Sequence, residues 1–222
     1  MKKIVKKQLK EDEFVSTMTK IYEFVKKRTR EIIIIAAAGV FFVLLYAGLR
    51  FLQAQNVKKE GELLSRMLEL RSELGQNPAK LAELKQMAGR GKFARLAFVL
   101  EATHWMEKGE LEKAKEALAT LQSEPRDFIY YQAQDLLGQI NLLQKNYDQA
   151  IAIYQKLEEA KPEEYGLDVI LFHKAEALEG KGDRTTALAL YKNIQEKYPQ
   201  SYYSFDASER VRKIESATPP SL

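Results

Sequence analysis

The sequence predicts an all-α protein in which a single N-terminal transmembrane helix is followed by a solenoid of helical hairpins. Two observations support this fold class. One uncharged, apolar segment of eighteen residues lies near the N-terminus, and three later segments repeat one pattern of small and large side chains at intervals of 36 and 37 residues. With 30% charged residues and only 11 Gly and 6 Pro among 222, the chain has the composition of a protein that forms a packed core.

The apolar segment Ile32–Leu49 has the length and composition of a membrane span. It contains no charged residue between Glu31 and Arg50. Such a helix extends about 27 Å, and two further apolar residues bring it to the roughly 30 Å of a bilayer core. A buried core helix is the alternative, although a soluble helix of this length normally keeps a polar face. Because thirty-one residues precede the segment, we interpret residues 32–52 as an uncleaved transmembrane helix rather than a cleaved signal peptide.

The charges around the span predict its orientation. Residues 1–31 form a basic tail with ten basic and five acidic side chains, and the sequence KKRTR at positions 26–30 adjoins the span. Basic flanks stay in the cytoplasm. We therefore expect a cytoplasmic N-terminus, a single pass through a bacterial inner (cytoplasmic) membrane, and a periplasmic domain after residue 52.

Within the tail, Phe14, Met18, Ile21 and Val25 recur at the spacing of an amphipathic helix. One interpretation is a helix that lies on the inner leaflet or against a membrane partner. The other is a generic basic tail that only sets the topology. The sequence leaves both open.

Three segments after residue 93 share a pattern of side-chain sizes that predicts pairs of helices. Ala114, Ala150 and Ala187 align with one another, 36 and 37 residues apart. Each is expected on the second helix of a pair, where only a small side chain fits. The equivalent small residues of the first helices are Ala102, Gly138 and Ala175. The large residues expected to fill the space between successive pairs are Leu118, Tyr154 and Tyr191, and Pro162 and Pro199 end two of the second helices. The turns KGE, KNYD and KGD supply glycine or asparagine for a left-handed helix end.

This pattern resembles the tetratricopeptide repeat over about residues 94–200. The resemblance implies a stack whose first helices line a concave, protein-binding face. Projecting the repeats onto one another places these candidate binding residues on that face: Leu96, Val99, Thr103, Met106, Asp135, Gln139, Leu142, Leu143, Phe172, Glu176 and Glu179. In the alternative interpretation, the apolar members are ordinary core covered by the C-terminal helix.

The remaining segments are assigned around this array. We expect a linker helix and a degenerate first helical pair in residues 53–90, three repeats in residues 91–200, a capping helix in residues 201–216 and a disordered tail in residues 217–222. Ser204 is the expected cap of the last helix, in which Val211 and Ile214 should cover the last repeat while Arg210, Arg212 and Lys213 face water.

Nothing in the sequence predicts an enzyme. There is no Cys, there are two His, and no glycine-rich phosphate loop, HExxH or GxSxG motif occurs. His104 and His173 are single and are interpreted as helix-face residues. We therefore predict no catalytic residue, cofactor, metal or small-molecule substrate. Residues 32–222 carry 25 basic and 26 acidic side chains, which argues against binding to nucleic acid.

The basic tail, the span, the helical array and the run KYPQSYY at positions 197–203 together resemble the YfgM-like family of ancillary SecYEG translocon subunits. That resemblance implies a non-enzymatic adaptor whose partners are translocon subunits and periplasmic chaperones. A structural docking component of another envelope machine, such as a secretion, pilus or cell-division assembly, is the alternative.

Overall fold

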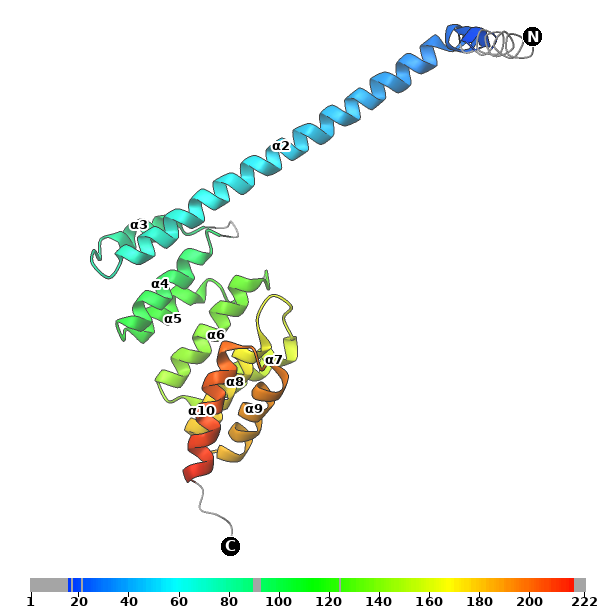
Figure 1. Cartoon of the computed structure of the whole chain (residues 1–222). Coiled ribbons are helices and arrows are strands. Elements are labelled where there is room, and N and C mark those ends of the chain that lie inside the picture. Colours follow the sequence, from blue (N-terminus) through cyan, green and yellow to red (C-terminus); the bar gives the residue numbers. More distant parts are fainter. Residues whose placement is uncertain (1–15, 17, 21, 90–92, 124, 218–222) are drawn as a thin grey trace, which may run out of the picture. The chain divides into compact units, whose positions relative to one another are not determined.

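The computed structural model describes residues 16, 18–20, 22–89, 93–123 and 125–217, and every regular element in these ranges is helical (Figure 1). The all-α fold class predicted from the sequence is thereby confirmed. The chain divides into two compact units, Met1–Lys59 and Glu60–Leu222.

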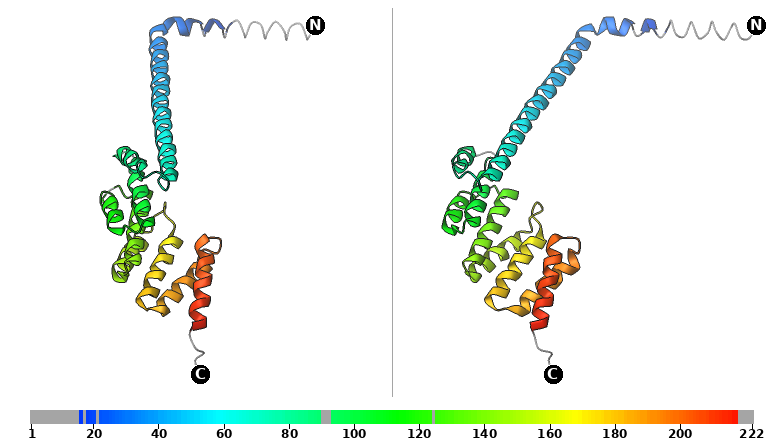
Figure 2. Two further views of the ribbon diagram at one scale, coloured as in Figure 1. Left: turned by 90° about the vertical axis from the view of Figure 1, so that its left-hand side faces the viewer. Right: turned by 60° about the vertical axis from the view of Figure 1, so that its left-hand side comes forward.

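In the first unit, two stretches of helix meet at a turn at Arg28 (Figure 2). Residues 22–27 are helical, and helix α2 begins at Thr29, whose hydroxyl donates a 2.8 Å hydrogen bond to the carbonyl of Val25. Of the four apolar residues expected to form an amphipathic face, Met18 and Val25 are exposed. The other two, Phe14 and Ile21, lie outside the described residues.

Helix α2 extends over 45 residues, Thr29–Glu73, and supplies residues to both units. It contains no proline, and the predicted span and the predicted linker helix after it form one uninterrupted helix. Its most apolar window is long and apolar enough to cross a membrane, and none of that window is buried by other described residues. This exposure argues against the alternative of a buried core helix.

The second unit contains the end of α2 and, among the described residues, a series of shorter helices. These are α3 (Lys80–Met87), α4 (Leu96–Glu107), α5 (Leu111–Ala119), α6 (Phe128–Leu143), α7 (Tyr147–Ala160), α8 (Leu167–Lys181), α9 (Arg184–Lys197) and α10 (Tyr202–Ala217). Helices α4 and α5, α6 and α7, and α8 and α9 pack side by side as pairs, and α10 packs against α9 and α8 (Figure 2). The predicted solenoid of helix pairs is therefore present.

The end of α2 and helix α3 pack onto the first of these pairs. Met67 and Leu70 of α2, together with Leu74 just beyond it, are fully buried. They form one apolar cluster with Leu84 of α3 and Ala97 of α4. This cluster joins the helices that precede the repeats to the core of the array.

Each repeated pair is held together by the small and large residues that the sequence pattern singles out. Ala114, Ala150 and Ala187 are fully buried, as are the large residues Tyr154 and Tyr191. Helices α6 and α7 approach each other closely at Gly138, where an added Cβ would overlap the ring of Tyr154. Tyr154, which was predicted to fill the space between successive pairs, contacts Gly138 within its own pair as well as the ring of His173 in the next pair.

The turns between the paired helices correct one detail of the sequence analysis. Gly109 and Gly182 have positive φ angles of 74° and 98°, as expected for glycines at left-handed helix ends. At the equivalent position of the middle repeat the left-handed residue is Lys145, with φ 62°, and not Asn146, whose φ is −83°. The register of the turn, rather than residue preference, decides which residue adopts this conformation.

The last helix begins three residues earlier than its predicted cap implies. Helix α10 starts at Tyr202, and the hydroxyl of Ser201 accepts a 3.1 Å hydrogen bond from the backbone N–H of Tyr203. Ser204, the predicted cap, is instead buried in the first turn. Val211 and Ile214 are buried against the last repeat, as predicted. Residues 218–222, most of the predicted disordered tail, lie outside the described residues.

We predict that Gly138→Ala destabilises the array by about 1–3 kcal/mol, because the new methyl group must displace a fully buried tyrosine ring. The free energy of unfolding, measured by urea titration of the full chain in detergent, tests this. Gly61→Ala in α2 is the matched control, since a Cβ there meets no atom within 4 Å. The control should be neutral or stabilise the helix by up to about 1 kcal/mol. Equal effects of the two changes would contradict the packing assigned to Gly138.

We predict that Lys145→Gly stabilises the protein by about 1 kcal/mol, because glycine adopts the left-handed conformation without the steric cost of a Cβ. The same substitution at Lys156, an exposed residue inside α7, should destabilise by a similar amount, since glycine is a poor helix former. Opposite shifts of the unfolding midpoint are the expected result. A loss of stability at both positions would contradict it.

Candidate protein-binding groove

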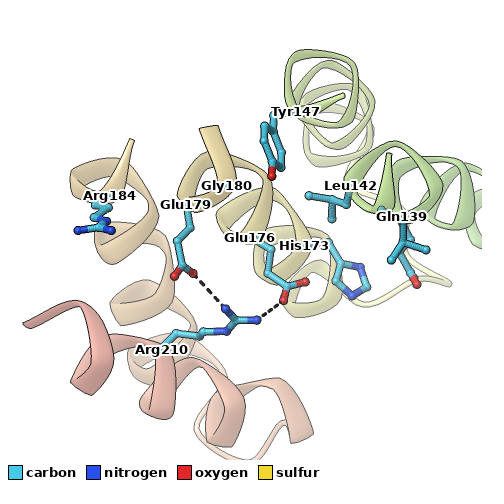
Figure 3. A pocket seen from close by; sticks show the side chains of 10 residues that line it. Gln139, Leu142, Tyr147, His173, Glu176, Glu179, Gly180, Arg184 and Arg210 are labelled. Carbon is cyan, nitrogen blue, oxygen red and sulfur yellow. Dashed lines mark hydrogen bonds and ion pairs between the residues drawn. The ribbon is translucent and has the colours of Figure 1, made fainter. Parts of the chain in front are cut away.

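A groove of about 470 Å³ opens between the first helices of the last two repeats and the final helix, and we call it the α6–α8 groove (Figure 3). Helix α6 contributes Gln139, Leu142 and Leu143 to its lining. Helix α8 contributes His173, Glu176, Glu179 and Gly180. Helices α7, α9 and α10 add one side chain each at the edges. The groove therefore has an apolar end on α6 and a charged end on α8.

The apolar end is formed by Leu142, Leu143 and Tyr147. Leu143 is 60% exposed, which makes it one of the few large apolar side chains left uncovered in the described part of the second unit. Tyr147 lies directly over Gly180, where an added Cβ would overlap the tyrosine ring. The absence of a side chain at Gly180 thus allows Tyr147 to form a wall of the groove.

The charged end consists of two carboxylates that share one guanidinium group. Glu176 and Glu179 lie one turn apart on α8, and Arg210 reaches both from α10 (Figure 3). Its Nη2 lies 2.6 Å from Oε1 of Glu176, and its Nη1 lies 3.3 Å from Oε2 of Glu179. The hydroxyl of Tyr191 also donates a 3.1 Å hydrogen bond to Oε2 of Glu179. Arg210, predicted to face water, is instead an ion-pair partner of the groove.

Glu176 and Glu179 are both partly buried, with side-chain exposures of 25% and 19%. Burial raises the pKa of the Glu176 carboxyl group, and the neighbouring carboxylates of Glu179 and Asp206 raise it further, whereas His173 and Arg210 lower it. The raised pKa means that the positive charges around Glu176 do not fully offset burial and the negative charges.

Beneath the groove, the buried residue Asp135 connects helices α6, α7 and α8 and the segment between α7 and α8 through its carboxylate and its backbone carbonyl. Its Oδ1 lies 2.8 Å from Nδ1 of His173, and its Oδ2 accepts 2.8 Å hydrogen bonds from the hydroxyl of Tyr165 and the amide of Gln139. The backbone carbonyl of Asp135 accepts a 3.1 Å hydrogen bond from Tyr154. Asp135 is only 4% exposed, so these bonds replace those that it would make with water. They fix the position of α6 relative to α8.

The negative charge of Asp135 raises the pKa values of the titratable side chains bonded to it. Burial raises the pKa of Tyr165 and of Tyr154, and the charge of Asp135 raises both further, so these hydroxyls remain protonated donors. Burial lowers the pKa of His173, but the hydrogen bond to Asp135 and the charges of Asp135 and Glu176 outweigh this effect. The net result is a pKa of His173 above its ordinary value, which favours a buried ion pair with Asp135.

The structure divides the predicted binding residues into four groups. Those that line the groove are Gln139, Leu142, Leu143, Glu176 and Glu179. Asp135 lies beneath it, bonded to His173 and Gln139 of the lining. Phe172 lines the adjoining hollow and packs against the ring of Tyr203 from α10, so the capping helix covers part of the predicted face. The four candidates on α4 are not part of the groove: Leu96, Val99 and Met106 belong to an apolar cluster, and the hydroxyl of Thr103 donates to the carbonyl of Val99.

Four side chains that shape the groove were not among the predicted residues: Tyr147, His173, Arg184 and Arg210. His173, which we interpreted as a helix-face residue, lies on α8, where it is 8% exposed and bonded to Asp135. His104 is similarly buried, at 4%, with its ring edge-on to Trp105. Sequence spacing could not identify Arg210, because its role depends on how α10 docks.

No three His, Asp or Glu side chains are grouped as a metal site requires in the parts of the chain that the structure describes. The groove offers hydrogen-bond acceptors, one bridging guanidinium and an uncovered apolar surface. These are the features of a surface that binds polypeptide.

Comparison with known families supports the assignment of the repeats. Residues 132–163 and 170–201 match the tetratricopeptide repeat family model. The C-terminal half therefore contains tetratricopeptide repeats, and the two matched segments contain the helix pairs whose first helices line the groove. The comparison with curated proteins gives no match.

We predict that the two histidines affect stability with opposite pH dependence. Because folding raises the pKa of His173, the contribution of this residue to the free energy of unfolding is fully present below the ordinary histidine pKa of about 6.5. That contribution is lost as the pH rises through the pKa of the folded state. Burial, followed by the charges of Arg71 and Lys108, lowers the pKa of His104. Its contribution is present above about pH 6.5 and is lost as the pH falls towards the lowered value.

Unfolding free energies of the full chain and of the variants His173→Gln and His104→Gln, measured between about pH 5 and pH 9, provide the test. The difference in unfolding free energy between the parent chain and His173→Gln should decrease as the pH rises. The difference for His104→Gln should shrink as the pH falls. Parallel curves for both variants would show that neither histidine is coupled to its surroundings as described.

Proposed function

We propose that the chain is a single-span, membrane-anchored scaffold that mediates interactions between proteins and has no catalytic activity of its own. Tetratricopeptide repeats form concave surfaces that bind polypeptide, and the C-terminal half contains such repeats. The observation that carries the proposal is the α6–α8 groove, in which apolar and charged side chains on neighbouring first helices are left accessible to a partner.

The anchor is the apolar part of α2. Its window of highest hydropathy is unburied and the segment before it is basic, which supports a cytoplasmic N-terminus and a periplasmic repeat domain in a bacterial inner membrane. A scaffold placed in this way would work at the periplasmic surface of the membrane, where exported chains emerge.

The partners that we propose are subunits of the Sec translocon and periplasmic chaperones, so that the protein links the two. The combination of basic tail, span and repeat array supports this proposal, as does the resemblance to the ancillary translocon subunits. The alternative is a docking component of a secretion, pilus or cell-division assembly. Both functions use the same groove and differ in the identity of the bound protein.

Site-specific photo-crosslinking tests the scaffold function. With benzoylphenylalanine in place of Leu143, the expected adducts in intact cells are translocon subunits or periplasmic chaperones. The same probe at Arg212, which is exposed on α10 and does not line the groove, is the control and should not give these adducts. Adducts restricted to another envelope assembly would favour the alternative. No adduct in cells, together with no partner captured from membranes in mild detergent, would overturn the scaffold proposal.

We expect the topology to place the two termini on opposite sides of the membrane. An alkaline phosphatase fusion at the C-terminus should be active, and a green fluorescent protein fusion at the same site should be dark, because the two reporters require the periplasm and the cytoplasm respectively. The mature protein should keep its first residues and remain with the membrane after carbonate extraction. A cleaved N-terminus would identify α2 as part of a signal sequence, and a cytoplasmic C-terminus would contradict the proposed location.

A further inference from the structure

We propose that the α6–α8 groove selects segments that combine an apolar side chain with a lysine or arginine, and that Arg210 occupies the cation site when no partner is bound. The inference rests on the proposed scaffold function and specifies the chemistry of the segment that the groove accepts.

Arg210 itself shows what the charged end of the groove binds. Its guanidinium comes from a different helix and lies between Glu176 and Glu179 with charge-assisted bonds of 2.6 and 3.3 Å. The Arg210 side chain is 36% exposed, so the contact is open to solvent and to competition from an incoming cation. The groove therefore holds a cationic side chain that is supplied by its own chain.

The carboxylates have acceptor capacity that Arg210 does not use. Arg210 bonds only Oε1 of Glu176 and only Oε2 of Glu179, and Tyr191 bonds the latter oxygen as well. In the described part of the chain, the second oxygen of each carboxylate has no hydrogen-bond partner. A lysine or arginine from a partner can therefore add to the pair or replace Arg210 without leaving a carboxylate unpaired.

The surroundings of the acid pair also favour a cation. Asp206, Glu209 and Lys213 of α10 line the hollow that adjoins the groove and shares Glu176 and Arg210 with it, so acidic side chains outnumber basic ones there. Burial and the carboxylates of Glu179 and Asp206 raise the pKa of Glu176, whereas His173 and Arg210 lower it, and the net direction is upwards. An additional positive charge would relieve the repulsion among these carboxylates, whereas an additional carboxylate would increase it.

The apolar requirement follows from the opposite end of the same groove. Leu143 is 60% exposed beside Leu142 and Tyr147, so an aliphatic or aromatic side chain of a partner can be buried there. A further cation of the lining, Arg184, lies at the edge on the side of Glu179, away from Leu142 and Gln139 (Figure 3). The groove thus presents an apolar surface and an anionic pair to one bound segment.

Three fluorescein-labelled peptides test this selectivity. They share a leucine pair and a glycine–serine background and differ at one position, which is lysine, glutamate or norleucine. Binding to the full chain in phosphatidylcholine nanodiscs is measured by fluorescence anisotropy, and empty nanodiscs correct for partition into lipid. The lysine peptide should bind about tenfold more tightly than the glutamate peptide, with the norleucine peptide between them.

Four variants locate the effect. Arg210→Gln should strengthen binding of the lysine peptide several-fold by freeing the acid pair, whereas Arg212→Gln, the same change at an exposed position of α10, should leave it unchanged. Glu176→Gln should remove most of the preference for lysine over norleucine. Leu143→Ser should weaken the binding of all three peptides by a similar factor. Unfolding midpoints of each variant separate these effects from loss of structure.

Several outcomes would overturn the inference. Tightest binding of the glutamate peptide would show that the groove prefers anions. Weaker binding of the lysine peptide to Arg210→Gln, with an unchanged unfolding midpoint, would show that Arg210 does not occupy the site of the incoming cation. No binding of any peptide, or binding insensitive to Leu143 and Glu176, would show that the groove is not the site. In either case, partner adducts obtained by crosslinking in cells would still support the scaffold function. The absence of any partner would contradict both the scaffold function and the proposed selectivity of the groove.

Discussion

The contact between Gly138 and Tyr154 is the constraint on which the groove depends. With no side chain at Gly138, the tyrosine ring of α7 lies against the backbone of α6, and its hydroxyl reaches the carbonyl of Asp135. The ring is fully buried, so this contact fixes the separation of the two helices. The position of α6 determines where its exposed residues meet α8, which makes the groove a consequence of packing within the middle repeat.

The polar network beneath the groove extends this constraint from one repeat to the next. Asp135 bonds to His173 of α8 and to Tyr165 in the connection between α7 and α8. Apolar contacts alone would tolerate small sliding of neighbouring helices, whereas a buried carboxylate requires its partners at fixed positions. The network therefore holds the apolar and charged ends of the groove at a constant spacing, which a selective binding surface needs.

The sequence predicted the helix pairs because close packing imposes a size requirement that recurs in every repeat. It could not predict the chemistry of the concave face in the same way. Val99, Asp135 and Phe172 occupy equivalent positions, 36 and 37 residues apart, yet the first is apolar core, the second is a polar hub and the third packs against Tyr203 of α10. A repeat fixes the course of the backbone, whereas the neighbours of each side chain decide its role.

The final helix explains why the groove lies at the C-terminal end of the array. One side of α10 buries Ala207, Val211 and Ile214 against the last repeat, as a capping helix must. Because consecutive residues of a helix point about 100° apart, Arg210 lies beside this buried face and is directed towards α8. The same docking that closes the apolar core thus brings a guanidinium to Glu176 and Glu179. On α4, by contrast, the equivalent face is occupied by apolar packing, so no acid pair and no bridging arginine could form there.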